Sequence, residues 1–167
     1  FARDITPFLK AGTDNLLAVR VDNSHNPDII PLDADFTFYG GIYRDVYLIA
    51  TRAVHFDMLN MGSKGLFIST PEVDSNRARI NIRGTIVNEQ DHPSTITLHH
   101  RLIDDDEKRV ASLRKKIRLD AGQTYRFEDT SLSINNPRLW SPSNPNLYTM
   151  VSTIVDESGR AIDRVQN

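Results

Sequence analysis

The sequence predicts an all-β protein whose main part is a sandwich of two sheets, and three observations support this. Apolar and polar residues alternate over several short runs, which is typical of strands with one solvent-exposed face. From about residue 52 to the end, turn residues separate these runs roughly every 8–12 residues, a spacing typical of β-sandwiches. No helical periodicity of useful length is present.

The clearest strand is 77–87, because its even positions are apolar or small while its odd positions are mostly polar. Residues 108–116 have a mixed pattern and are predicted to be strand from their context. The best helical candidate is a short turn over residues 6–11, which Gly12 would end. The expected strands are 16–21, 43–49, a short run beginning at Val54, 77–87, 94–103, 115–119, 124–134 and 147–155.

The composition excludes several classes of protein and site. The chain has no Cys, so disulfide frameworks, Cys-based zinc sites and cysteine nucleophiles are excluded. A net charge of −2 does not indicate a nucleic-acid-binding protein. Residues 1–51 carry seven acidic and four basic side chains, whereas the remainder carries fifteen and sixteen. No apolar run approaches the ~20 residues of a membrane span, and no targeting signal is recognised in these residues, so a periplasmic and a cytoplasmic location both stay open.

The most informative segment is 136–148, NPRLWSPSNPNLY, which places the only Trp of the chain among three prolines. Each proline fixes φ and removes a backbone donor, which excludes a helix interior or a central strand. The segment is therefore predicted to be a rigid, extended crossing before the strand that follows. We predict that Trp140 is buried in the sandwich core and stabilises it. An ordinary Pro-rich loop with one core Trp is the simpler interpretation of the same residues.

This segment resembles the immunoglobulin-like β-sandwich domain that precedes the catalytic barrel in glycoside hydrolase family 2, the β-galactosidase and β-glucuronidase family. Residues 33–48, DADFTFYGGIYRDVYL, resemble the end of the same family's N-terminal sugar-binding jelly roll. Residues 1–23 match the part of that domain just before it. The resemblance implies that residues 1–51 are the C-terminal part of a jelly-roll (galactose-binding-like) domain and that residues 52–167 are the immunoglobulin-like sandwich.

In the family, a Gly-Gly-aromatic-Arg turn leads into the last strand of the jelly roll, which implies structural roles for Gly40, Gly41 and Arg44. The Arg44 guanidinium can fork to a carboxylate or to carbonyl groups and hold the turn. A jelly roll has about eight strands, of which residues 1–51 can supply two or three. Apolar side chains such as Leu17, Val19, Val21, Val46 and Leu48 are therefore expected to lack a covering sheet.

The resemblance also implies one substrate-binding residue. In the bacterial β-galactosidases, an Asp before the Gly-Arg turn reaches the hydroxyls of the sugar in the pocket of the barrel, and the matching position is Asp35. A carboxylate suits this role because it can accept hydrogen bonds from two adjacent hydroxyls. The alternative is that Asp35 is a turn residue that binds local backbone. Relatives often have a Trp two or three residues later, where this chain has Thr37 and Phe38, so the substrate stays open.

No catalytic residue is assigned. Glycoside hydrolysis generally needs two carboxyl groups, which the family places on a TIM barrel of roughly 250 residues. None of the five Glu residues lies in a matching motif. We therefore expect accessory domains that support the barrel and help to wall its pocket. The chain alone should be inactive and should meet a carbohydrate substrate through the parent enzyme. The alternatives are a stand-alone carbohydrate-binding module and a structural spacer.

No metal or cofactor site is expected. His99 and His100 are adjacent in a predicted strand, so they point to opposite faces and form a poor metal-binding pair. Residues 104–107 resemble a calcium loop only in charge, because the alternating ligand pattern with Gly is missing. A solvated hairpin turn is the better interpretation. No nucleic-acid or membrane partner is expected, and whether the parent forms a homo-oligomer is left open.

Overall fold

The computed structural model describes residues 2–30, 33 and 39–167, and the chain divides into two units. The larger unit comprises residues 51–167 with a few N-terminal residues up to Asp4, and the smaller comprises Ile5–Ala50. Within the described residues, no helix is long and apolar enough to cross a membrane.

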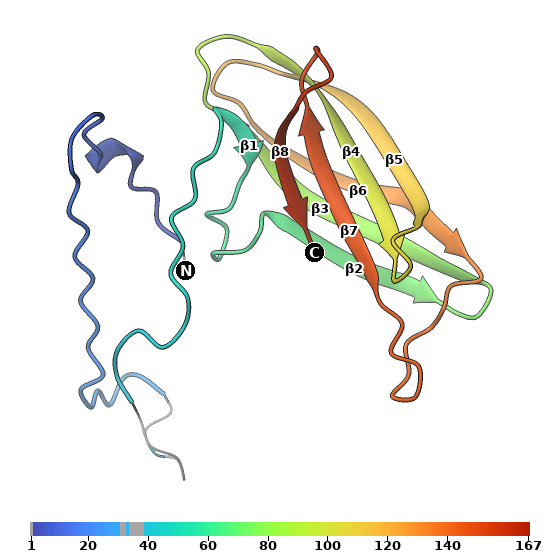
Figure 1. Ribbon diagram of the computed structural model, residues 1–167, viewed down its shortest axis with the longest axis horizontal. Helices are drawn as coiled ribbons and strands as arrows, with labels where there is room; N and C mark the ends of the chain where they lie inside the picture. Colours follow the sequence, from blue (N-terminus) through green and yellow to red (C-terminus); the bar gives the residue numbers. More distant parts are fainter. Residues whose placement is uncertain (1, 31–32, 34–38) are drawn as a thin grey trace. The chain divides into compact units, whose positions relative to one another are not determined.

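The larger unit is an antiparallel β-sandwich, which confirms the predicted all-β fold (Figure 1). In the first sheet, β3 is central, with β6 along one edge and β1 and β2 along the other. Its strands are β1 Val54–Phe56, β2 Leu66–Val73, β3 Arg77–Asn88 and β6 Thr124–Asn135. The second sheet has the order β5-β4-β7-β8. Its strands are β4 Ser94–Asp104, β5 Arg109–Leu119, β7 Tyr148–Val155 and β8 Ala161–Gln166.

The core follows from the period-two alternation of the strands. Successive side chains of a strand point to opposite faces, so the even positions of β3 and β4 turn inward together. The fully buried core side chains come from both sheets and include Phe56, Ile82, Ile86, Leu98 and Ile154. Burying each of these contributes roughly 1.5–3 kcal/mol, so the two inner faces hold the sheets together.

Five of the predicted strands in the sandwich were located correctly from the sequence, namely those that became β1, β3, β4, β6 and β7. The strand β5 extends back to Arg109, so the prediction of strand for residues 108–116 is confirmed. Two strands were missed, β2 and β8. In β2 the register with β3 shifts between Ser69 and Glu72, around Pro71. A proline within the run weakens the sequence signal and is tolerated because β2 is an edge strand.

In the smaller unit, residues 16–21 and 43–49 were predicted to be strands, and this prediction is wrong for the structure described. A strand needs a backbone partner, and the described residues of this unit offer none. The expectation of uncovered apolar side chains is confirmed, because Leu17, Val19, Val21, Val46 and Leu48 are all exposed. The only helical element described is the 3-10 turn η1 at Thr6–Phe8, which is shorter than predicted.

Gly84 of β3 makes room for a core aromatic ring. A Cβ at this position would lie 2.6 Å from Cζ of Phe127 and 2.8 Å from Cδ2 of Leu66. Both neighbours are buried, so neither can move aside without disturbing the core. The small residue is therefore required by the packing of Phe127.

We predict that Gly84→Ala lowers the free energy of unfolding by about 1–3 kcal/mol, because the added methyl overpacks the core. Urea denaturation of the 167-residue chain measures the change. Ser131→Ala, at an exposed position of β6, is the control and should stay within about 0.5 kcal/mol of the unmodified chain. Equal urea midpoints for Gly84→Ala and the control would contradict the prediction, because the core would then accommodate the added methyl group.

Candidate functional site

The connection between β6 and β7, residues 136–147, protrudes from one end of the sandwich and is called the Trp140 loop here (Figure 1). Its tip is closed by a two-way backbone bridge, with Ser141 N–H donating to the Asn144 carbonyl at 2.9 Å and the reverse bond at 3.1 Å. The Asn146 side-chain amide donates to the Leu139 carbonyl at 2.9 Å. The three prolines add local rigidity. The loop is therefore held in one conformation by its own polar groups.

The loop is also fastened to the turn between β4 and β5. The Arg138 guanidinium lies 3.4 Å from Asp104 and 3.2 Å from Asp106, and the Leu147 N–H donates to Asp105 at 3.1 Å. Partial desolvation lowers the pKa of Arg138, but Asp106, Asp104 and Asp105 outweigh it and raise that pKa overall. The acidic turn, predicted to be a plain solvated hairpin, thus holds the loop in place. Sequence reasoning missed this role because the two segments lie about thirty residues apart.

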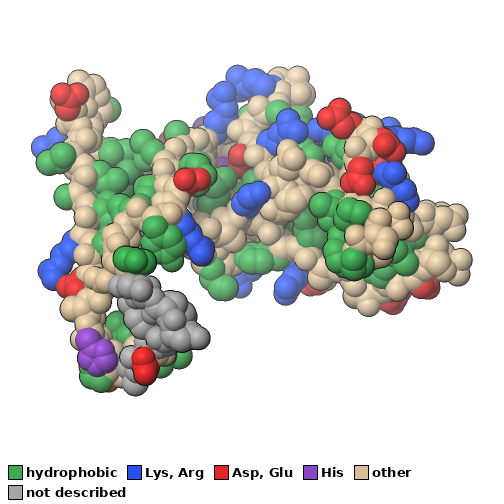
Figure 2. Space-filling view, turned by 60° about the horizontal axis from the view of Figure 1, so that its bottom comes forward, with side chains coloured by type: hydrophobic (Ala, Val, Ile, Leu, Met, Phe, Trp, Pro, Cys, Tyr) green, Lys and Arg blue, Asp and Glu red, His purple; other side chains and the backbone are tan. Residues whose placement is uncertain are grey.

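The prediction that Trp140 is buried in the core is wrong. Trp140 is 61 % exposed, and the neighbouring Leu139 and Leu147 are 44 % and 64 % exposed. The reason is that apolar side chains of both sheets already fill the interior, while the loop itself protrudes from one end of the sandwich. Figure 2 shows hydrophobic side chains gathered at this end of the sandwich beside acidic ones. An exposed apolar cluster on a rigid loop is typical of a contact surface.

The last residue of the chain lies at the same end of the sandwich as the Trp140 loop. Asn167 N–H donates to the Met150 carbonyl at 3.0 Å, and Met150 N–H donates back at 2.8 Å. Met150 follows Tyr148, whose hydroxyl accepts a bond from the backbone N–H of Arg138 at 2.8 Å. The root of the loop and the end of β8 are therefore joined through the first residues of β7.

A buried polar cluster links the two sheets. Ser152 of β7 and His100 of β4 are both fully buried, and His100 Nδ1 lies 2.7 Å from Ser152 Oγ. His100 Nε2 lies 3.5 Å from Asp129 Oδ2 of β6, in the opposite sheet. Lys115 of β5 completes the cluster, with its Nζ 3.3 Å from the other Asp129 oxygen. Sequence reasoning considered His100 only as a poor metal ligand beside His99 and did not single out Ser152, Asp129 or Lys115.

A contiguous Ser–His–Asp arrangement is typical of hydrolases with a serine nucleophile, but burial and geometry exclude that role here. Neither Ser152 nor His100 has any exposed surface, so no substrate can reach the hydroxyl. The His100 Nε2 and Asp129 Oδ2 atoms have no hydrogen-bond partner among the described residues, so their 3.5 Å separation is an electrostatic contact only. The cluster is a structural tie between the sheets.

Burial determines the charge state of the cluster. Desolvation lowers the pKa of His100 to about 4, against the opposing attraction of Asp129. Burial also acts to lower the pKa of Lys115, but the hydrogen bond and charge of Asp129 outweigh it and raise that pKa. At neutral pH the cluster therefore holds a neutral imidazole near a protonated Lys115.

The other residues named from the sequence lie mainly in the smaller unit. Asp35 falls outside the described residues, so its contact with a sugar stays a prediction. Gly41 has φ of +100°, a conformation that favours glycine. A Cβ at Gly40 would lie 2.6 Å from Cγ of the exposed Asn23 side chain, which would have to shift. The Arg44 guanidinium lies 5.5 Å from the centre of the Tyr43 ring. The fork to carboxylate or carbonyl groups expected of Arg44 stays a prediction.

The described residues contain no group of three or more His, Asp or Glu side chains suited to hold a metal ion. His99 and His100 point to opposite faces of β4, as expected, because His100 is buried between the sheets while His99 lines a surface depression. The larger unit therefore presents exposed apolar side chains on the Trp140 loop and a polar cluster in its interior.

A sequence profile of the glycosyl hydrolases family 2 matches residues 64–167 of this chain. A β-galactosidase of Bacteroides ovatus is 34 % identical over 157 residues, which cover 93 % of this chain and 17 % of that protein. A β-glucuronidase of Bacteroides fragilis is 31 % identical over 99 % of this chain and 23 % of its own length.

A crystal structure of a Bacteroides uniformis β-glucuronidase superposes with a TM-score of 0.91 at 42 % identity. The superposition covers 98 % of this chain and 20 % of that one. The chain thus spans less than a quarter of the length of the relatives named here. The similarity extends over nearly the whole chain, including the segment that carries Asp35.

We predict that Trp140→Ala changes the free energy of unfolding of the 167-residue chain by less than about 1 kcal/mol, because the indole is largely exposed. Tyr148→Phe should cost about 1 kcal/mol, because it leaves the Arg138 N–H without its acceptor. Urea denaturation of both variants provides the test. A loss of about 3–5 kcal/mol for Trp140→Ala, as for a buried aromatic, would instead place the indole in a core.

We predict that stability falls as the pH drops from about 6.5 towards 4, through His100. Its pKa is lower in the folded chain than in the unfolded one, so the unfolded state takes up the proton first and is favoured. The difference between the unmodified chain and His100→Gln should shift by on the order of 3 kcal/mol across this window. His92→Gln, at an exposed histidine, is the control. Parallel pH curves for His100→Gln and the unmodified chain would contradict a neutral, buried imidazole.

Proposed function

Because this chain belongs to glycosyl hydrolase family 2, we propose that it forms accessory, non-catalytic β domains of a longer glycosidase. The sandwich supports the catalytic barrel, and residues 1–51 help to wall its sugar pocket. The relatives named β-galactosidase and β-glucuronidase are glycosidases several times longer than this chain. The carboxylates that perform hydrolysis therefore belong to another part of the parent protein, which acts on a carbohydrate of the class those names describe.

The observation that carries the proposal is the Trp140 loop. It exposes Leu139, Trp140 and Leu147 on a loop whose conformation is held by Arg138 and the acidic turn. The exposed apolar surface is on the order of 300 Å², well below the roughly 800 Å² per partner of a stable interface between separate proteins. A contact of this size suits a domain of the same polypeptide, because the linkage keeps its effective concentration high.

The position of the loop supports the same partner. Asn167 pairs with Met150 near the start of β7, the strand into which the Trp140 loop leads. The indole N–H of Trp140 favours a partner that supplies one acceptor within an otherwise apolar hollow. We therefore propose that the loop packs against the catalytic barrel and orients it.

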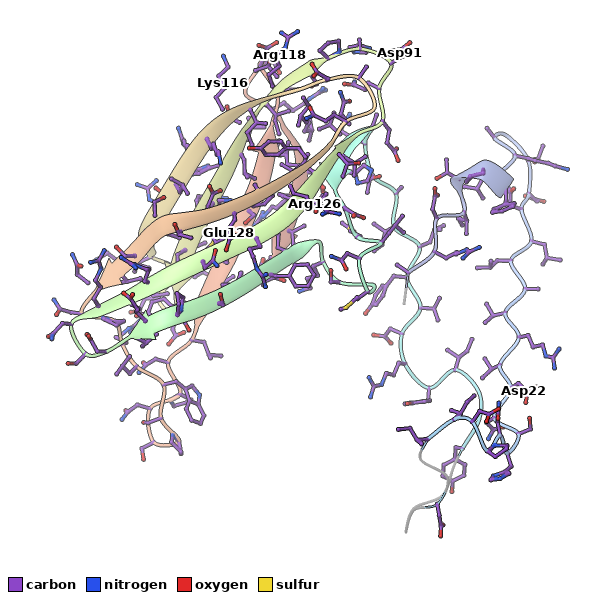
Figure 3. The ribbon with its side chains drawn as sticks, turned by 180° about the vertical axis from the view of Figure 1, so that it is seen from behind. Asp22, Asp91, Lys116, Arg118, Arg126 and Glu128 are labelled. Carbon is purple, nitrogen blue, oxygen red and sulfur yellow. The ribbon has the colours of Figure 1, made fainter. Side chains whose placement is uncertain are left out.

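The carboxylates of the sandwich support a non-catalytic role. Glu72 pairs with Arg79 at 3.1 Å, and Glu128 accepts a bond from Asn81 at 2.7 Å. Both acids are engaged on the outer face of the first sheet, where Figure 3 shows Glu128 close to Arg126. Neither of them forms the pair of free carboxyl groups across a cleft that glycoside hydrolysis needs.

We predict that the 167-residue chain alone does not hydrolyse nitrophenyl β-galactoside or β-glucuronide, whereas a parent protein with its barrel does. In that parent, Leu139→Ala should lower the thermal midpoint by several degrees, because it removes packing from the proposed domain contact. Leu59→Ala is the matched control, since it makes the same change at a comparably exposed Leu of the sandwich.

Turnover by the isolated chain, after a contaminant control, would reject the non-catalytic role. Equal midpoints for the Leu139→Ala and Leu59→Ala parents would reject the Trp140 loop as the contact with the barrel and leave the non-catalytic role standing. The two readouts therefore test the two parts of the proposal separately.

A further inference from the structure

The outer face of the second sheet is built from the odd positions of β4 and the residues paired with them. Ile96 and Leu98 are buried, so Thr95, Thr97 and His99 point outward. The register pairs these three with Arg118, Lys116 and Arg114 of β5. Directly paired residues share a face, so the three cations of β5 also point outward. Figure 3 shows Lys116 and Arg118 projecting from the same end of β5.

Positive charge predominates on the strands of this face, while Asp156 and Glu157 border it in the turn between β7 and β8. We call this outer surface of the second sheet the basic face. Its cations are Arg101, Arg109, Arg114, Lys116, Arg118 and Arg164. The four strands lie wholly within the described residues, and none of their outward positions is Asp or Glu. None of the six cations forms an ion pair with a described residue. Because the whole chain has a net charge of −2, this concentration of cations is a local feature of one face.

Polar atoms without partners lie among these cations. Nε2 of His99, Nε of Arg101 and Oγ1 of Thr153 are buried and have no hydrogen-bond partner among the described residues. Thr153 is only 7 % exposed and is paired with His99 in the sheet, so its hydroxyl belongs to the same face. Buried polar atoms normally have partners. These three atoms are covered in the structure, so a ligand could bond to them only after the side chains above them move.

The face is also hollowed. An open depression of about 510 Å³ is bordered by Thr95, Thr97, His99, Arg114 and Lys116. Asp156 and Glu157 of the turn between β7 and β8 close one end of it, and Asp156 is already engaged by Arg160 at 3.2 Å. Burial lowers the pKa of His99, and the nearby charges of Arg114, Arg101 and Arg109 lower it further. A neutral imidazole can both donate and accept hydrogen bonds there.

We propose that the basic face binds an acidic polysaccharide, whose carboxylates pair with Arg114, Lys116 and Arg118. The three cations occupy every second residue of β5, roughly 7 Å apart, which suits an extended polymer with repeated charges. The sugar hydroxyls bond to the threonine hydroxyls and to His99 in the depression. The proposal does not depend on the accessory role proposed above.

The chemistry of the face favours a polysaccharide over other polyanions. No large apolar side chain is exposed on β4, β5, β7 or β8, all of which are described. Protein interfaces have an apolar or aromatic centre, and single-stranded nucleic acids are bound through stacking on aromatic side chains. The face offers cations, hydroxyls and one imidazole, which match the carboxylates and hydroxyls of uronic acid units.

The test measures binding of the 167-residue chain to polygalacturonate by affinity electrophoresis and titration calorimetry, with neutral dextran as the reference polymer. We expect retention by polygalacturonate that weakens as salt is raised, and none by dextran. The double variant Lys116→Glu with Arg118→Glu should bind at least about tenfold more weakly. The matched control, Arg83→Glu with Arg126→Glu on the outer face of the first sheet, changes the net charge equally and should bind within about twofold of the unmodified chain.

No retention at low salt would overturn the proposal, and so would equal losses in the two double variants, because the binding would then follow net charge alone. Equal or tighter binding of poly-glutamate or single-stranded DNA would assign the face to a protein or nucleic acid partner instead. Thermal midpoints check that each variant is folded. If the charge reversals do not fold, Lys116→Gln with Arg118→Gln replaces them, with Arg83→Gln and Arg126→Gln as the control.

Discussion

The sandwich depends on the burial of the inward side chains of β3 against the second sheet. β3 is twelve residues long and pairs with three strands, so its alternation determines which face of β1, β2 and β6 turns inward. Ile82 and Ile86 are fully buried there, and Gly84 between them leaves space for Phe127. A shift of one residue in this register would bring Arg83 and Thr85 into the core, which keeps the register well defined.

In this sandwich, the residues that stabilise the fold lie in the interior, and the residues that could contact other molecules lie on the surface. The interior contains apolar side chains and a polar cluster, in which the fully buried His100 lies beside Asp129 of the opposite sheet. The sandwich presents two surfaces of different chemistry. The Trp140 loop is apolar and fastened in place, which suits contact with another domain, whereas the basic face is charged and hydroxyl-rich, which suits a soluble polyanion.

The smaller unit differs from the sandwich for a physical reason. Its apolar residues alternate as strands do, yet the described residues of Ile5–Ala50 form no strand and leave side chains such as Leu17 and Leu48 exposed. Alternation specifies which side of a strand is apolar but supplies neither a backbone partner nor a covering sheet. If residues 1–51 are the end of a jelly roll, as their resemblance implies, those partners belong to other strands of the same domain.

The sequence alone determined the all-β class, most strands of the sandwich and their inward faces, because these follow from period-two alternation and turn residues along the chain. Its motifs also indicated the family to which the chain belongs. Only the tertiary structure decided that Trp140 is exposed, that Arg138 is held by Asp104 and Asp106, and that His100 meets Asp129. Each of these three features depends on contacts between segments that are distant in the sequence, and local sequence patterns do not determine such contacts. The edge strand β2 was missed for a related reason, because its pairing with β3 outweighs the local effect of Pro71.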